Sequence, residues 1–285
     1  MLIAGHEIGR EPFTIAEVGL NHNGDLDRAR AMIGVAAALG VTAVKFQTFK
    51  AADVCDEEQE YAYQSQGKTV TEKRINIFRR AELPASAWAV LKAECERNNV
   101  VFLSTPETPA DLALLMKVGI PAIKIGSDNL TNLPMLRYCA QSGLPIILSC
   151  GMSDMKELHA ALHIVSNAVV MVCTSQYPCP PDEANLARVE TLLKYCAEYV
   201  GFSDHTSDHM SAAIAVALGA SVFEKHFTLS HDLRGPDHWW SANPRELAEW
   251  VHTINTAWTM LGDGKIEPSE REREAKAKYQ RRVAA

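Results

Sequence analysis

Two histidines stand at corresponding places in this chain, each a few residues beyond a short apolar run. His205 follows the run at residues 199–202, and His226 follows the run at 221–223. The alanine-rich segment 211–218 between them has helical composition, so we predict two parallel, adjacent strands joined by a helix. Both imidazoles then lie at the carboxyl edge of one sheet, where such a pair suits a divalent metal with open coordination positions. The alternative is two unrelated polar residues at strand ends.

Two lysines, Lys45 and Lys124, lie inside apolar, strand-like runs. A buried, unpaired ammonium group is very unfavourable, so each lysine needs an anionic partner. That partner is either a protein carboxylate such as Glu17 or an anionic group of a substrate, and the sequence leaves both open. A third interpretation makes one lysine a Schiff-base nucleophile, but that chemistry does not need a histidine pair. Removing either lysine is expected to lower stability little, because a desolvation penalty is relieved.

Hydroxyl side chains follow the same apolar runs and favour a substrate as the partner of the lysines. Hydroxyl and ammonium groups together form the donor set of a pocket for a small, doubly anionic molecule. The hydroxyl residues are Thr105, Ser127, Ser149, Ser175 and Ser203.

The elements that must position these residues are eight strand-like runs in strict alternation with eight helical segments. The runs are almost continuously apolar, as is typical of parallel strands buried on both faces. The sequence therefore predicts an α/β fold, a (β/α)8 TIM barrel, with a doubly wound sheet as the alternative. In such a barrel the chemistry lies where strands end, which is where the residues above stand. The predicted strands are 13–18, 42–46, 100–103, 122–125, 145–148, 168–172, 199–202 and 221–223, and the predicted helices are 25–39, 85–98, 109–118, 133–142, 155–166, 186–196, 211–218 and 244–261.

We expect one domain over residues 1–285, because no Pro-, Gly- or Ser-rich linker divides the chain. Residues 1–12 precede the first strand and are expected to cap the bottom of the barrel. Residues 50–84 form a long polar insertion on the catalytic rim, either a lid or a mobile surface loop. Residues 265–285 form a highly charged tail, in which 269–282 has helical composition and is expected to be solvated.

Composition narrows the class of protein. The formal net charge of -7 gives no basic footprint for nucleic acid. No apolar run is long enough to span a bilayer, and no signal peptide is visible at the start. The seven cysteines are scattered and odd in number, which is typical of reduced thiols in the cytosol. We therefore expect a cytoplasmic protein that binds small molecules, with neither nucleic acid nor membrane as a partner.

Nine short motifs, in order over about residues 12–264, resemble those of the sialic acid synthase family. These enzymes condense phosphoenolpyruvate with N-acetylmannosamine or a related amino sugar. The resemblance implies a 2-keto-3-deoxy sugar acid and phosphate as products, with C–O cleavage of phosphoenolpyruvate. The alternatives are a Schiff-base aldolase or lyase on the same barrel and a catalytically silent homologue. The motifs are AEVGLNHNG (16–24), VKFQT (44–48), LSTPE (103–107), IKIGS (123–127), CGMS (150–153), CTSQYP (173–178), GFSDHT (201–206), EKHFTL (224–229) and GPDH (235–238).

The resemblance also assigns roles. It implies that His205 and His226 bind a divalent ion, most often Mn²⁺, with Mg²⁺ or Co²⁺ as alternatives. Glu17 and Asp237 match the acid–base carboxylates of the family. The implied catalytic residues are Glu17, Asp237, Lys45 and Lys124; the residues implied to bind phosphoenolpyruvate are Lys45, Thr105, Lys124, Ser127, Ser149, Ser175 and Ser203; those implied to bind the sugar are Gln47, Asn129, Tyr177 and Asp237.

Departures from the family pattern fall mainly on the sugar side. Members often carry an acidic residue second after the IKIGS-like run; here Asp128 and Asn129 follow it, so the acid is displaced by one position or a sugar contact is lost. Ser175 stands where some members have asparagine. Members typically continue into a C-terminal antifreeze-like domain that supplies an arginine to the partner subunit. We expect a homodimer, with N-acetylmannosamine a poor substrate or a separate polypeptide completing the sugar site. Tyr61 and Tyr63 of the insertion are expected to cover the sugar.

Overall fold

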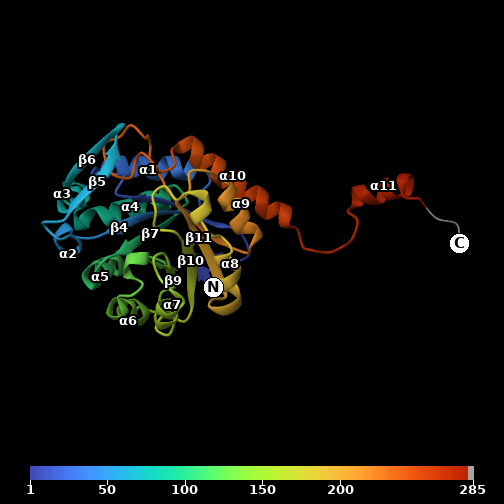
Figure 1. Cartoon of the computed structure of the whole chain (residues 1–285), viewed down its shortest axis with the longest axis horizontal. Helices are drawn as coiled ribbons and strands as arrows, with labels where there is room; N and C mark the ends of the chain where they lie inside the picture. Colours follow the sequence, from blue (N-terminus) through green and yellow to red (C-terminus); the bar gives the residue numbers. More distant parts are fainter. Residues whose placement is uncertain (282–285) are drawn as a thin grey trace.

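The computed structural model describes residues 1–281 and shows an eight-stranded parallel sheet curled into a barrel (Figure 1). Hydrogen bonding runs in the order β7-β4-β3-β12-β11-β10-β9-β8, and β7 and β8 lie side by side to complete the ring. Chain order therefore runs around the barrel, as the predicted alternation requires. The strands are β3 (Phe13–Gly19), β4 (Ala43–Thr48), β7 (Val101–Pro106), β8 (Ile123–Ile125), β9 (Ile146–Ser149), β10 (Ala168–Cys173), β11 (Tyr199–Asp204) and β12 (Val222–His226).

Eight helices follow these strands in the described residues and pack around the barrel. Capping side chains mark the start of several of them: Asp25 accepts hydrogen bonds from two backbone N–H groups at the start of α1, and Thr108 and Asp111 form a capping box on α5. Gly119, at φ 87°, ends α5 in the left-handed region that glycine adopts without strain. The helices are α1 (Leu26–Ala38), α4 (Ala85–Arg97), α5 (Pro109–Val118), α6 (Leu133–Gln141), α7 (Met155–Leu162), α8 (Arg188–Tyr195), α9 (Met210–Ala217) and α10 (Pro244–Leu261).

The strands alternate between two faces although they read as continuous apolar runs. Residues such as Val44, Phe46 and Phe102 face the helices and join the larger apolar core. Residues such as Ile15 and Leu103 face the barrel interior and form a separate cluster. The two faces follow from the two-residue period of a strand. The fold class predicted from the sequence is confirmed.

A small hairpin lies under the amino-terminal ends of the strands. It consists of β1 (Leu2–Ile3) and β2 (His6–Glu7), which pair antiparallel. Ile3 and Ile8 are buried in the interior cluster with Phe13 and other barrel residues. The hairpin thus covers the end of the barrel opposite the predicted chemistry.

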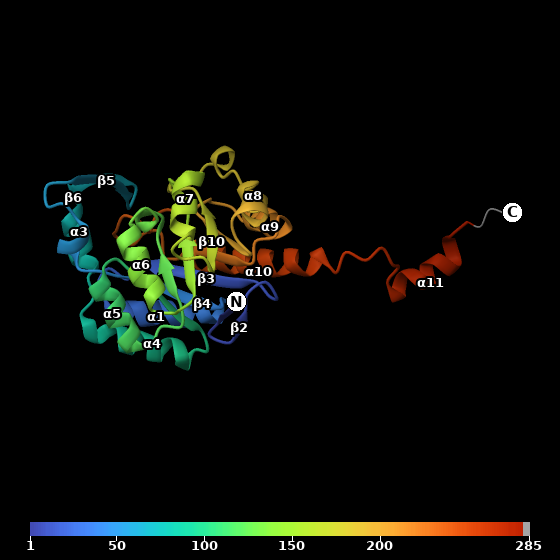
Figure 2. The same ribbon diagram turned by 90° about the horizontal axis from the view of Figure 1, so that it is seen from below.

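The insertion at residues 50–84 is built from regular elements. It contains α2 (Ala51–Val54), an antiparallel hairpin of β5 (Glu60–Ser65) and β6 (Lys68–Lys73), and α3 (Arg74–Ala81). The hairpin projects beyond the barrel rim (Figure 2). Its tip is tied to the loop after β12, because Gln66 Nε2 donates to the Asp232 carbonyl (2.9 Å). The polar composition of this stretch concealed these elements.

The charged tail continues from α10 and carries α11 (Glu270–Tyr279), which lies away from the barrel (Figure 2). No residue of α11 is buried, as expected for a solvated helix. The last part of the predicted tail, residues 282–285, lies outside the described residues. Among residues 1–281, no helix is long and apolar enough to cross a membrane.

Candidate active site

A cavity of about 560 Å³ opens at the carboxyl ends of the barrel strands. Thirteen of the fourteen predicted site residues line it, and the fourteenth, Asp237, lines an adjoining cavity of about 370 Å³. The structure therefore brings together side chains that are as much as 209 positions apart in the chain. The thirteen are Glu17, Lys45, Gln47, Thr105, Lys124, Ser127, Asn129, Ser149, Ser175, Tyr177, Ser203, His205 and His226.

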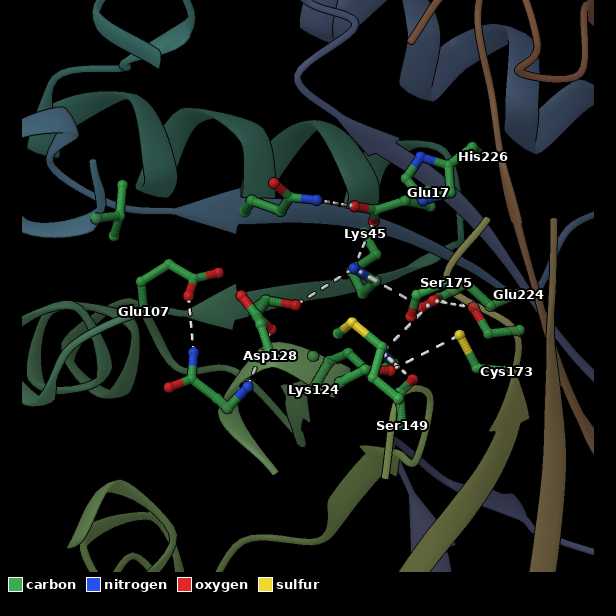
Figure 3. A pocket seen from close by; sticks show the side chains of 18 of the residues that line it. Glu17, Lys45, Glu107, Lys124, Asp128, Ser149, Cys173, Ser175, Glu224 and His226 are labelled. Atoms are coloured by element: carbon green, nitrogen blue, oxygen red, sulfur yellow. Dashed lines mark hydrogen bonds and ion pairs between the residues drawn. The ribbon is translucent and has the colours of Figure 1, made fainter. Parts of the chain in front are cut away.

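Lys45 and Lys124 line the cavity and belong to a chain of charged contacts (Figure 3). Lys45 Nζ is 2.6 Å from Glu17 Oε2 and 3.7 Å from Glu224 Oε2. Lys124 Nζ is 3.4 Å from Glu224 Oε1. All four side chains are almost fully buried. Of the two kinds of anionic partner that the sequence left open, both lysines thus have protein carboxylates. Both lysines also face the cavity, where a substrate anion could reach them.

Glu224 is the residue that sequence reasoning missed. It accepts a hydrogen bond from Ser203 Oγ (2.9 Å) in addition to its two lysine contacts. Burial alone would raise the pKa of Glu224, but the Lys124 and Lys45 ammonium groups outweigh it and hold the pKa at about 2. A signal was available in the sequence, because Glu224 precedes His226 by two residues and so shares its face of the strand.

The pKa of Glu17 is shifted in the opposite direction from that of Glu224. Burial and the neighbouring Glu224 raise its pKa despite the Lys45 ammonium beside it. Gln47 Nε2 donates to Glu17 Oε1 (2.8 Å), whereas Glu17 Oε2 is buried without a hydrogen-bond partner of good geometry. A carboxyl group in this setting binds a proton more readily than an exposed glutamate does.

The predicted hydroxyls surround the two ammonium groups. Lys124 Nζ donates to Ser149 Oγ (2.8 Å), and Lys45 Nζ donates to Thr105 Oγ1 (3.3 Å). Ser127 Oγ accepts from the Gly151 N–H (3.0 Å) at the next strand end. The hydroxyls of Ser175 and Ser203 also face the cavity. Donors therefore converge on one space from several strands, which is the arrangement that an anionic ligand requires.

His205 and His226 are neighbours, as the strand–helix–strand unit predicted. Their ring centroids are 5.6 Å apart, and both belong to adjacent parallel strand ends. His205 Nδ1 donates to the Thr174 carbonyl (2.7 Å), so the Nε2 of the neutral ring is free of a proton. Burial and the nearby His205 lower the pKa of His226 well below its ordinary value, and His226 Nδ1 is buried without a hydrogen-bond partner. Burial would lower the pKa of His205, but Cys173 and the Thr174 carbonyl outweigh burial and raise it. The two imidazoles therefore stand side by side, and the lone pairs of His205 Nε2 and His226 Nδ1 are available whenever His205 is neutral.

The adjoining cavity is formed by the insertion and by the loop after β12. Tyr61 and Arg74 come from the insertion, and Asp237 and Trp240 come from the loop. Burial, with a contribution from Glu17, raises the pKa of Asp237 to about 7. Only one tyrosine of the predicted aromatic pair lines this cavity: Tyr63 is buried inside the insertion, where its hydroxyl donates to Glu72 (2.6 Å).

A parallel barrel with ion-paired lysines, converging hydroxyls and a histidine pair at its carboxyl rim defines a (β/α)8 protein built to bind a small anion. Residues 32–266 match the NeuB family. The chain belongs to the NeuB family.

Relatives of known name support this membership. The chain is 36% identical to the N,N'-diacetyllegionaminic acid synthase of Legionella pneumophila, over 95% of this chain and 79% of that protein. It is 33% identical to the N-acetylneuraminate-9-phosphate synthase of Mus musculus, over 89% and 72% of the two chains. The crystal structure of the N-acetylneuraminic acid synthetase of Leptospira borgpetersenii in complex with citrate superposes with a TM-score of 0.87 at 32% identity, covering 98% of this chain and 95% of that one.

A more distant structure shares the fold alone. A truncated 3-deoxy-D-arabino-heptulosonate 7-phosphate synthase of Thermotoga maritima superposes with a TM-score of 0.69 at 14% identity. The predicted family, the predicted barrel and the predicted synthase class are confirmed together.

Proposed function

We propose that this protein condenses phosphoenolpyruvate with an aldose or N-acyl amino sugar, giving a 2-keto-3-deoxy sugar acid and phosphate. One observation carries the proposal: two buried lysines, ringed by hydroxyls, face a cavity that also holds a histidine pair. Lys45 and Lys124 are balanced by Glu17 and Glu224. Both ammonium groups also face the cavity, where the surrounding hydroxyl donors add to them, and together they suit a phosphate-bearing acid.

In this proposal, phosphoenolpyruvate lies on the cavity floor and the sugar lies toward the adjoining cavity. Lys45 and Lys124 bind the phosphate and carboxylate together with the hydroxyls of Thr105, Ser127, Ser149, Ser175 and Ser203. Gln47, Asn129, Tyr177 and Asp237 contact the sugar. These donors hold the two reacting carbons at close range.

The histidine pair fits a divalent metal, for which we propose Mn²⁺. The orphaned Nδ1 of His226 and the unprotonated Nε2 of His205 are the donor atoms that such an ion needs. Residues 1–281 contain no cluster of three His, Cys, Asp or Glu side chains arranged to hold a metal, so water or substrate would complete its coordination. Bound there, the ion would polarise the aldehyde carbonyl of the sugar.

The carboxyl groups move the protons of the reaction. C3 of phosphoenolpyruvate bonds to the aldehyde carbon, and the former carbonyl oxygen takes a proton. Asp237, whose pKa is about 7, is available as this acid on the sugar side. Water adds to C2 and gives one proton to the ionised Glu17. The C2–O bond to phosphate then breaks, and the C2 hydroxyl becomes the keto group as its proton passes to the leaving phosphate. The proton gained by Glu17 equals the one given by Asp237, so the reaction balances.

A Schiff-base aldolase remains the second candidate, but the surroundings of Lys45 disfavour it. Burial alone would lower the pKa of Lys45; Glu17 and Glu224 outweigh burial and raise it, and a charged amine does not attack a carbonyl. Borohydride trapping of a covalent adduct would support that candidate. Four expectations from the sequence stay predictions: a homodimer, a separate polypeptide at the sugar site, a single domain over 1–285 and a cytoplasmic location.

Phosphate release from phosphoenolpyruvate tests the proposal. The panel contains N-acetylmannosamine, its 6-phosphate, other N-acyl amino sugars and simple aldoses, each with and without Mn²⁺ and after chelation. We expect sugar-dependent release that chelation abolishes and Mn²⁺ restores. Phosphoenolpyruvate labelled with ¹⁸O at the bridging oxygen should deliver the label to phosphate, because the C2–O bond breaks. No release with any sugar, or label retained in the keto acid, would overturn the proposal.

A further inference from the structure

Glu107 is an acidic residue of the cavity wall to which no role has been given. It stands two residues after Thr105, immediately beyond β7, and lines the same cavity as Lys45 and Asn129. Asp128, from the loop after β8, lies close enough for its negative charge to raise the pKa of Glu107. Two acidic groups side by side on a cavity wall repel each other unless one carries a proton or a ligand lies between them.

The only hydrogen bond that Glu107 receives on its carboxyl group within the described residues comes from a neutral amide. Asn129 Nδ2 donates to Glu107 Oε2 (2.8 Å), a contact that Figure 3 shows as a dashed line from Glu107. Asn129 Oδ1 in turn accepts from Asn132 Nδ2 (2.9 Å), which fixes the orientation of the amide. Among residues 1–281, no lysine, arginine or histidine lies within 4 Å of Glu107 to form an ion pair. Glu107 is thus an oriented carboxyl group without a charged partner.

This carboxyl group offers a proton to the cavity. Burial raises the pKa of Glu107 to about 8, with Asp128 adding to the rise and Lys45 opposing it. Lys45 is already engaged with Glu17 and Glu224, so it compensates Glu107 only weakly. At neutral pH the group is mostly protonated and keeps an O–H donor beside the oxygen that Asn129 holds.

We propose that Glu107 binds the second substrate, donating its O–H to a hydroxyl or acyl oxygen of the sugar, and that Asn129 positions Glu107 for this contact. The inference rests on the proposed function. The family pattern has an acidic residue at the position of Asn129, and the sequence left two explanations: displacement of the acid to Asp128, or loss of the sugar contact. The proposal adds a third explanation, in which Glu107 supplies the acidic group from the loop after β7 and is held by Asn129.

Steady-state kinetics at saturating phosphoenolpyruvate test the proposal, with the sugar of the panel above that gives the fastest phosphate release. Initial slopes against sugar concentration give kcat/KM even where the site does not saturate. Glu107→Ala should lower kcat/KM for the sugar by about tenfold to a hundredfold, the usual loss for one such hydrogen bond, while KM for phosphoenolpyruvate changes less than about twofold. Glu107→Gln, which keeps a neutral donor, should retain most of the activity at pH 7. Asn129→Ala should cause a smaller loss, and Glu96→Gln on the outer face of α4 serves as the control.

A pH series adds a readout that a structural role would not move. Above about pH 8 the wild type should lose sugar affinity as Glu107 ionises, whereas Glu107→Gln should not. The other charged groups facing Glu107 are Asp128, Asp111 and Lys45, and both proteins share them. Equal losses for sugar and phosphoenolpyruvate, or a Glu107→Ala variant with wild-type sugar kinetics, would overturn the proposal. Absence of any wild-type turnover would instead overturn the proposed function, which separates the two failures.

Discussion

The lower and upper halves of the barrel interior use the same strands and the same inward face but opposite chemistry. In the lower half, Ile15, Ala43, Leu103, Ile147 and Val222 form an apolar cluster. Two residues further along each strand the inward positions become polar or charged. They are Glu17, Lys45, Thr105, Ser149 and Glu224.

This change along one face separates the part of the barrel interior that stabilises the fold from the part that carries the chemistry. Apolar side chains in the lower half are held only by close packing, so removing atoms there lowers stability. The charged groups above are buried at a desolvation cost and compensate one another in pairs. Breaking such a pair affects both stability and chemistry. The comparison predicts different consequences for substitutions only two residues apart.

The largest expected effect is on turnover, from the histidine pair at the top of the interior. His205→Ala and His226→Ala should each lower kcat at least about a thousandfold, because several kcal/mol of carbonyl activation would be lost. Thermal unfolding should change little for His226→Ala, since His226 Nδ1 has no partner in the fold, and more for His205→Ala, which removes the donor to the Thr174 carbonyl. His252→Ala on the exposed face of α10 is the control. Wild-type turnover by either variant without added metal would contradict the metal assignment.

Lys45→Met should lower both activity and stability. It leaves Glu17 and Glu224 buried with one cation fewer, a loss of about 3–5 kcal/mol in the free energy of unfolding. This prediction differs from the expectation from the sequence, that removing this lysine lowers stability little, because the structure places two carboxylates beside it. Glu17→Gln in the same chain should restore part of the stability but not the activity. Denaturant unfolding measures both variants, with exposed Lys117→Met as the control; unchanged stability of Lys45→Met would disprove the network.

Leu103→Ala, two residues before Thr105 on the same strand, should lower stability without changing substrate binding. Leu103 is fully buried in the lower cluster, so a cavity there lowers the free energy of unfolding by about 2–5 kcal/mol. Below the unfolding transition, KM for phosphoenolpyruvate should stay unchanged. A large change in KM with little loss of stability would show that the two halves are not separate in function.

The smallest expected effect is a change in pH dependence at Asp237. Its raised pKa of about 7 keeps the carboxyl group protonated below that pH and ionised above it. As a proton donor, it should make kcat/KM fall as pH rises through about 7. Asp237→Asn should remove this limb and lower the plateau about a hundredfold. A rate profile whose limb near pH 7 survives the substitution would assign that limb to another group.

The sequence alone determined the elements and the residues that end them. Strands and helices follow from local apolar patterns and capping side chains, so the eight βα units and the positions of His205 and His226 were readable. The insertion at 50–84 was the exception, because a polar hairpin lacks the apolar pattern on which such predictions rest.

Only the tertiary structure decided which charges meet. Lys124 on β8 and Glu224 on β12 lie 100 residues apart on strands that do not neighbour each other, and they approach to 3.4 Å only because the sheet closes into a barrel. Glu107 and Asn129 meet because two consecutive βα loops fold onto one wall. Partners of this kind depend on the distance across a closed barrel, which no local periodicity encodes. Local sequence therefore set the strand ends, and closure of the barrel set the electrostatics of the site.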